Sequence, residues 1–171
     1  RRAVGDRGAV DVLFRRALER SWNNTGEACL ICLLAVLDHR TLGIRFPLLG
    51  PLLWIPLTGE FEDAYRARVH ALPSRLYADT PPEGDRDKLQ HFFGSALLTI
   101  LCESASSSDA FGLFVEEEEE AFIVGGTNDP RDVRANRQGQ RFALALMDSL
   151  GTLPSPFLAP GNGGDTRKRN P

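Results

Sequence analysis

Two stretches of the sequence place polar residues four positions apart at the start of an apparent helix. Residues 85–95 read DRDKLQHFFGS and contain Asp87 and His91, whereas residues 128–139 read NDPRDVRANRQG and contain Asp132 and Asn136. Residues four apart share one side of a helix. A histidine with carboxylates can hold a divalent cation, and an amide can orient a water or a substrate oxygen. These four residues are therefore taken as one candidate polar site.

A run of glutamates lies between the two stretches, in FGLFVEEEEEAFIVGG. Such a run is usually a solvated helix face. Glu119 and Glu120 flank the approach to the glycine pair that ends this segment, so both stay candidates for chemistry. A metal site would use His91, Glu120 and Asp132, and no cofactor other than a divalent metal is indicated.

The first stretch is predicted to open a helix over residues 85–103, with Asp85 as its N-cap. The large apolar residues fall on one face at about 100° per residue, and Asp87 and His91 fall on the other. That second face is small and partly apolar, so we expect it to contact another element. His91 is then a half-buried polar group that needs a partner.

The second stretch is predicted to open a helix over residues 129–150, with Asp129 as its cap. Asp132 and Asn136 fall on the stripe of this helix that should face the core. A carboxylate taken out of water needs donors or a cation, because its burial is otherwise costly. We therefore expect His91 to lie next to Asp132.

Three further segments predict helices, at residues 9–22, 26–38 and 59–72. The first is amphipathic, and the second is apolar on every side, as in a helix surrounded by others. No segment shows convincing alternation of apolar and polar residues. The predicted fold class is all-α, a compact bundle of about five to six helices forming a single domain over residues 1–150.

Residues 46–58, FPLLGPLLWIPLT, form an apolar segment that three prolines keep from being a regular helix. One interpretation is an irregular connection that fills the core. The other is an exposed apolar patch that lies in a membrane interface or against another subunit. The interface residues on the second interpretation are Phe46, Leu48, Leu49, Leu52, Leu53, Trp54 and Ile55.

Residues 151–171 have the composition of a tail without structure of its own, rich in proline and glycine. We expect this tail to be extended and to dock on a partner, with Phe157 and Leu158 among the contacting residues.

Composition narrows the function further. The net charge of −3 lacks the basic excess of most nucleic-acid-binding proteins, so nucleic acid is not expected as a partner. Cys29 and Cys32 lie inside an apolar run and are interpreted as buried thiols. The longest apolar run, residues 28–37, falls short of the roughly 20 residues that cross a bilayer, and no transmembrane helix is predicted.

The order DKLQHFFGSALL, a glutamate-containing helix, GG and DxxxNxxG resembles the YfiM-like envelope lipoproteins and, more distantly, the VanZ-like membrane proteins. The resemblance covers residues 85–146. It implies a protein of the bacterial cell envelope that is associated with a membrane. The motif positions it implies are Asp87, His91, one of Glu119 and Glu120, Asp132, Asn136 and Gly139.

Two functions stay open on the sequence. The first is an accessory or interaction protein of the bacterial envelope, a peripheral subunit of a membrane complex, whose partners are a membrane surface or membrane-protein subunits. Its polar residues would then lock two helices together. The second is a metal-assisted hydrolase that uses the same polar cluster, although no complete catalytic signature is present. A groove beside residues 46–58 that binds a small ligand or a lipid is a third, weaker reading.

Overall fold

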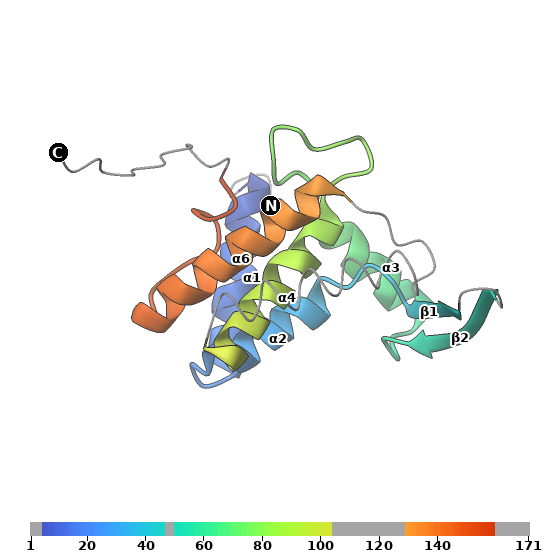
Figure 1. The fold of residues 1–171 in the computed structure, drawn as a ribbon, viewed down its shortest axis with the longest axis horizontal. Coiled ribbons are helices and arrows are strands. Elements are labelled where there is room, and N and C mark those ends of the chain that lie inside the picture. Colours follow the sequence, from blue (N-terminus) through green and yellow to red (C-terminus); the bar gives the residue numbers. More distant parts are fainter. Residues whose placement is uncertain (1–4, 47–49, 104–128, 160–171) are drawn as a thin grey trace.

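The computed structural model describes residues 5–46, 50–103 and 129–159 of the chain. Within these ranges it contains the helices α1 (Gly5–Arg20), α2 (Thr25–Ala35), α3 (Glu62–Ala71), α4 (Arg86–Cys102) and α6 (Pro130–Asp148). The strands β1 (Thr41–Phe46) and β2 (Gly50–Pro56) form one antiparallel hairpin. The predicted all-α fold is confirmed, with this hairpin added to it (Figure 1). None of the described helices combines the length and the apolarity needed to cross a membrane.

Helix α4 is the centre of the bundle and packs against both α2 and α6. Its predicted apolar face is confirmed, because Leu89, Phe92, Phe93 and Ala96 are fully buried. On α6, the ring of Phe142 contacts three aromatic rings of the described residues, with centroid distances of 5.0 Å, 5.4 Å and 5.7 Å. Those three partners are Phe14, Phe92 and Phe157. Aromatic packing therefore joins α1, α4, α6 and the segment after α6 in one core.

Helices α4 and α6 approach each other closely at Gly139. A Cβ atom at this position would lie 2.1 Å from the backbone oxygen of Phe92. No side chain fits at that distance, so the glycine permits backbone contact between the two helices. This contact fixes the crossing point from which both helices present their polar residues.

The hairpin corrects the expectation that residues 46–58 are irregular. Strand β2 pairs with β1 from Thr41 opposite Pro56 to Phe46 opposite Gly50, with a shift in register between Ile44 and Arg45. Each strand of a two-stranded sheet is an edge, so prolines on β2 leave missing amide donors without breaking a central ladder. The sequence pattern is not alternating because both faces of β2 are apolar.

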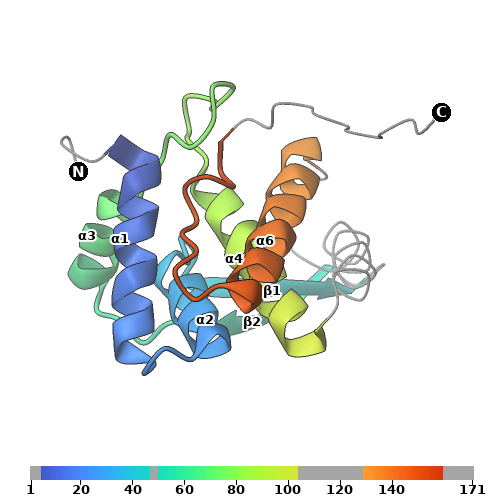
Figure 2. The same cartoon turned by 90° about the vertical axis from the view of Figure 1, so that its left-hand side faces the viewer.

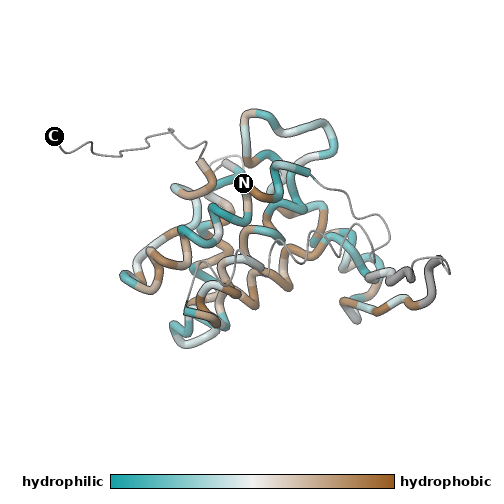
Figure 3. Tube along the Cα trace, viewed as in Figure 1, coloured by the Kyte–Doolittle hydropathy of each residue, from teal (hydrophilic) through white to brown (hydrophobic). Residues whose placement is uncertain are grey.

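The hairpin extends away from the helices at the right of Figure 1. Leu53, Trp54 and Ile55 of β2 are 52%, 57% and 38% exposed. The core-filling interpretation is therefore wrong for these three residues. Figure 3 shows hydrophobic residues in β2, away from the bundle. Leu48 and Leu49 lie outside the described residues, as do the side chains of Phe46 and Leu52.

Of the tail that we expected to dock on a partner, the described residues 151–159 pack against their own chain. Leu158 is fully buried in the core of its own chain, and the ring of Phe157 packs on Phe142. The backbone nitrogen and the hydroxyl of Ser155 donate to the Asp11 carboxylate at 2.8 Å and 2.7 Å. Figure 2 shows this segment lying between α1 and α6. Residues up to 159 therefore belong to the helical domain, and residues 160–171 lie outside the described part.

Helix α2 is less enclosed than its composition indicates. Ala28, Cys29 and Cys32 are buried, but Leu30 and Leu34 are 42% and 53% exposed. These two leucines lie one turn apart and form an exposed apolar stripe on α2. The expectation that other helices surround this helix on every side is therefore wrong.

Candidate functional site

The polar residues of α4 and α6 gather around the ammonium of Lys88. Its side chain is only 1% exposed, and Nζ lies 2.6 Å from Asp87 Oδ2. The same nitrogen lies 2.9 Å from Asp129 Oδ2 and 2.6 Å from Asp132 Oδ1. One cation thus joins three carboxylates, one from α4, one from α6 and one from the N-cap of α6. We call these four residues and His91 the lysine cluster.

His91 and Asp132 meet as the sequence predicts. His91 Nε2 lies 3.3 Å from Asp132 Oδ1, and the two side chains are 21% and 9% exposed. Neither His91 nor Lys88 reaches this oxygen with the angles of a hydrogen bond. The buried oxygen is therefore held by charge rather than by a directed donor.

A second set of ion pairs continues from Asp129. The Asp129 carboxylate caps α6 by accepting from the backbone nitrogen of Arg131 at 2.9 Å, which confirms the predicted cap. The Arg131 guanidinium lies 2.7 Å from Asp129 and 3.0 Å from Asp85. Asp85 makes no capping bond to α4, contrary to expectation, and its fully buried carboxylate also accepts from the Thr80 hydroxyl. The N-terminal ends of α4 and α6 are thus joined by several bridges.

Asn136 lies one turn after Asp132 and contacts a different residue of α4. Its side-chain oxygen accepts from the hydroxyl of Ser95 at 2.8 Å. Thr99, one turn further along α4, donates to the backbone oxygen of Ser95 at 2.8 Å. The predicted stripe of α6 therefore makes a neutral contact in addition to the charged one.

Burial and neighbouring charges shift the pKa values of Lys88 and Asp129 in opposite directions. Burial lowers the pKa of Lys88, but its contacts with Asp132, Asp87 and Asp129 outweigh burial and hold that pKa above its ordinary value. Burial raises the pKa of Asp129, but its bonds with Arg131 and Lys88 hold it well below the ordinary range. Lys88 is thus a charged ammonium at neutral pH.

The structure brings four of the predicted site residues together and leaves two untested. Asp87, His91 and Asp132 belong to the lysine cluster, and Asn136 lies beside it. The candidates Glu119 and Glu120 lie outside the described residues.

Lys88 itself was missed by sequence reasoning, although its position carries a signal. Lys88, Phe92, Ser95 and Thr99 follow one another at spacings of four, three and four, which describe a single helix face. All four side chains are buried. A lysine that begins such a stripe needs carboxylates opposite it, and Asp132 on α6 meets that need.

The predicted metal site includes His91 and Asp132, which belong to the lysine cluster. Among residues 5–46, 50–103 and 129–159, no group of three or more histidine, cysteine or acidic side chains is arranged as the ligands of a metal ion. The Lys88 ammonium lies at the point where the carboxylates of Asp87, Asp129 and Asp132 converge. A divalent cation at this point would have to displace that ammonium.

No protein-family model, curated protein or solved structure matches this chain.

Proposed function

We propose that this protein is a non-catalytic accessory protein of the bacterial envelope that attaches to a membrane surface through the β1–β2 hairpin. The observation that carries this proposal is the exposure of Leu53, Trp54 and Ile55 in β2. Residues 46–57 contain no charged or polar side chain, so the described part of β2 belongs to a longer apolar segment. An exposed apolar element of this kind is typical of protein or membrane contacts.

A lipid bilayer suits this hairpin better than a protein groove. Side chains alternate between the faces of a strand, so Leu53 and Ile55 point to one face and Trp54 to the other. Both faces are therefore apolar and exposed. A flat protein surface would cover one of them, whereas the interfacial region of a bilayer surrounds both. Tryptophan is also enriched at membrane interfaces.

The backbone of the hairpin limits how deeply it can enter. Both strands are edges, and unpaired backbone groups are costly in the hydrocarbon region. Pro51 and Pro56 have no amide donor, which lowers that cost along β2. The Trp54 ring lies against Gly43 on β1, where a Cβ atom would be 2.8 Å from the ring, so the ring covers backbone. These features favour a shallow position at the interface rather than a crossing.

The base of the hairpin is held to the rest of the protein by polar contacts. Arg40, just before β1, donates to Glu62 at 2.5 Å and to the backbone oxygen of Glu60 at 2.7 Å. The hydroxyl of Tyr65 on α3 donates to the backbone oxygen of Asp38. Because the hairpin is held at its base, its attachment to a membrane would also hold the helical bundle there.

The lysine cluster has a structural role in this proposal. It joins the N-terminal ends of α4 and α6 through ion pairs between Lys88 and the carboxylates of Asp87, Asp129 and Asp132, and such a buried network favours one arrangement of the two helices. The alternative, a metal-assisted hydrolase, stays a prediction. It would require a metal ion to take the place of the Lys88 ammonium beside Asp132.

Flotation with vesicles tests the proposal. Protein mixed with vesicles of phosphatidylethanolamine and phosphatidylglycerol is expected to rise with them in a density gradient. The combined substitution of Leu53, Trp54 and Ile55 by glutamate should leave the protein folded and abolish flotation, because charged groups are costly to move into the interface. The matched control is Leu150→Glu, at a residue that is 60% exposed and lies after α6. Equal flotation of the triple variant and the control would reject the proposal.

A further inference from the structure

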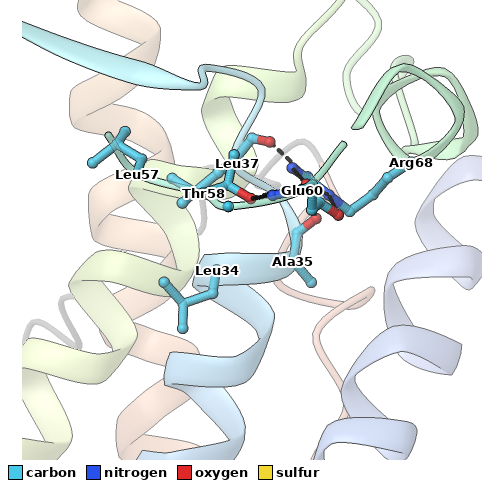
Figure 4. Close-up of a pocket in the computed structure, with 8 residues that line it drawn as sticks. Leu34, Ala35, Leu37, Leu57, Thr58, Glu60 and Arg68 are labelled. Atoms are coloured by element: carbon cyan, nitrogen blue, oxygen red, sulfur yellow. Dashed lines mark hydrogen bonds and ion pairs between the residues drawn. The ribbon is translucent and has the colours of Figure 1, made fainter. Parts of the chain in front are cut away.

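An open pocket of about 450 Å³, called the cavity below, lies where the hairpin joins the bundle. Its walls come from the end of α2 and from the chain after β2, and Figure 4 shows Leu34 and Leu57 on either side of it. The other residues lining it are Ala35, Leu37, Thr58, Gly59, Glu60 and Arg68. We propose that this cavity binds the aliphatic chain of a lipid.

The polar groups that line the cavity are bonded to one another. The Arg68 guanidinium donates to the backbone oxygens of Ala35 and Leu37 at 2.9 Å and 2.6 Å. It also donates to the Glu60 carboxylate at 2.8 Å, and the Thr58 hydroxyl donates to the same carboxylate at 3.2 Å. The charge of Arg68 is thus matched by Glu60. The cavity presents no excess charge to attract an ionic ligand.

The remaining surface of the cavity favours hydrocarbon. Leu34, Leu37 and Leu57 are apolar, and an aliphatic chain packed against them would cover surface that the open pocket leaves to water. The volume falls within the range of small-molecule sites, which are mostly apolar with a few polar groups. Leu34 is 53% exposed, so filling the cavity would also remove apolar surface from water.

The position of the cavity points to a lipid as the source of that chain. Leu57 directly follows Pro56, the last residue of β2, so the cavity lies at the root of the element proposed to enter the membrane interface. Leu30 continues the exposed stripe of α2 beyond Leu34. An acyl chain that leaves the bilayer beside the hairpin would meet this apolar surface. In this respect the inference rests on the proposed membrane attachment.

Stearic acid with a nitroxide near its methyl end is a probe for the cavity. In the full-length protein without vesicles, we expect the nitroxide to weaken the NMR methyl signals of Leu34, Leu37 and Leu57. The signals of Val12 and Leu150, which are 48% and 60% exposed elsewhere, should keep their intensity. Equal loss at all five residues would reject the cavity as a site. A second arm uses a phosphatidylcholine with the same label in vesicles, which distinguishes a bilayer lipid from a free fatty acid.

Two tryptophan substitutions on the same face of α2 make the test specific. Leu34→Trp should fill the cavity and weaken stearate binding by roughly tenfold or more. Leu30→Trp, one turn away and outside the lining residues, should leave binding unchanged. Leu57→Trp gives a second filling variant on the opposite wall. If binding by both filling variants equals that of Leu30→Trp, the inference is wrong.

The two proposals can fail separately. The stearate experiment without vesicles does not require Trp54, so the glutamate triple variant of the hairpin should still bind the probe. For the triple variant, loss of flotation with retained stearate binding supports both proposals. For the wild-type protein, flotation without localised stearate binding supports the membrane attachment and rejects the cavity. Localised stearate binding by a wild-type protein that does not float rejects the membrane attachment alone.

Discussion

Lys88 Nζ on α4 lies 2.6 Å from Asp132 Oδ1 on α6, and both side chains are almost fully removed from solvent, at 1% and 9% exposure. This contact replaces a simple pairing of His91 with Asp132 by a cluster in which one ammonium serves three carboxylates. Removal of the Lys88 ammonium would leave the carboxylates of Asp87, Asp129 and Asp132 close together without the cation that they share. The stability of the α4–α6 pair should therefore depend on Lys88.

Lys88→Met should lower the free energy of unfolding at pH 7 by about 3–5 kcal/mol, the usual cost of removing one partner from a buried ionic network. Urea unfolding followed by circular dichroism measures this loss. The control is Arg66→Met, which removes the exposed ion pair of Arg66 with Glu62 and should cause no measurable change. Similar losses in the two variants would contradict a special role of Lys88.

Stability should depend less on pH in Lys88→Met than in the wild type. In the wild type, the lowered pKa of Asp129 contributes stability above the ordinary carboxyl range, and this is lost as pH falls below about 4. The raised pKa of Lys88 contributes stability that is complete below about pH 10 and is lost at higher pH. Without Lys88, Asp129 keeps its bonds with Arg131 but loses one of the contacts that lower its pKa. Lys88→Met should therefore lose less stability than the wild type as pH falls below about 4, whereas equal losses in acid would argue against the cluster.

Gly139→Ala should destabilise the protein by about 1–3 kcal/mol or more, because the added methyl would overlap the backbone oxygen of Phe92. The control is the other glycine of this helix pair, Gly94. A Cβ atom there would approach only Leu33, at 3.9 Å. Gly94→Ala should therefore be neutral or stabilise α4 by up to about 1 kcal/mol through helix propensity. Thermal melting of both variants gives the comparison, and equal melting temperatures would contradict the close contact.

The sequence predicts the helices and much of the polar site because periodicity reports burial. Asp132 falls on the apolar stripe of α6, and the structure buries it. The burial of Lys88 could not be predicted, because a charged residue usually lies in solvent. Its burial depends on Asp129 and Asp132, which lie far away in the sequence. Gln138 shows the same limit, since its buried side chain accepts from Tyr77 at 2.6 Å.

The hairpin and the segment after α6 could not be predicted for a different reason. Proline restricts φ and removes an amide donor, and glycine permits many conformations, so neither indicates a regular strand or helix and tertiary contacts decide the conformation of such segments. Ser155 is fixed by Asp11, a residue at the other end of the chain, and Leu158 is buried among side chains of several helices. The sequence of β2 does not alternate between apolar and polar residues, because Leu53, Trp54 and Ile55 are all apolar, so the pattern does not indicate a strand.

Leu158→Ala tests whether the segment after α6 belongs to the core. Because the Leu158 side chain is fully buried, its truncation should cost about 2–5 kcal/mol in the free energy of unfolding. Leu150→Ala, at a residue that is 60% exposed, should change this free energy by less than about 0.5 kcal/mol. Equal small changes in urea unfolding would mean that the segment does not pack as described.

Thiol labelling should distinguish the three cysteines. Burial raises the pKa of Cys29 to about 12, and burial and the neighbouring Cys29 raise that of Cys32 further. At pH 8 a thiol reagent should therefore modify only Cys102, which is exposed, and should modify all three in denaturant. Cys102→Ser should abolish rapid labelling of the native protein. Rapid labelling of two or more thiols would show that α2 is not buried as described.

Tryptophan emission tests the membrane attachment most directly. The chain has two tryptophans, and Trp22, which is 93% exposed in the turn between α1 and α2, serves as an internal control for Trp54. Trp22→Phe leaves Trp54 as the single reporter, and Trp54→Phe leaves Trp22. On addition of phosphatidylethanolamine and phosphatidylglycerol vesicles, the emission of Trp54 should shift to shorter wavelength while that of Trp22 stays unchanged. An unchanged Trp54 spectrum, or equal shifts for both tryptophans, would contradict attachment through the hairpin.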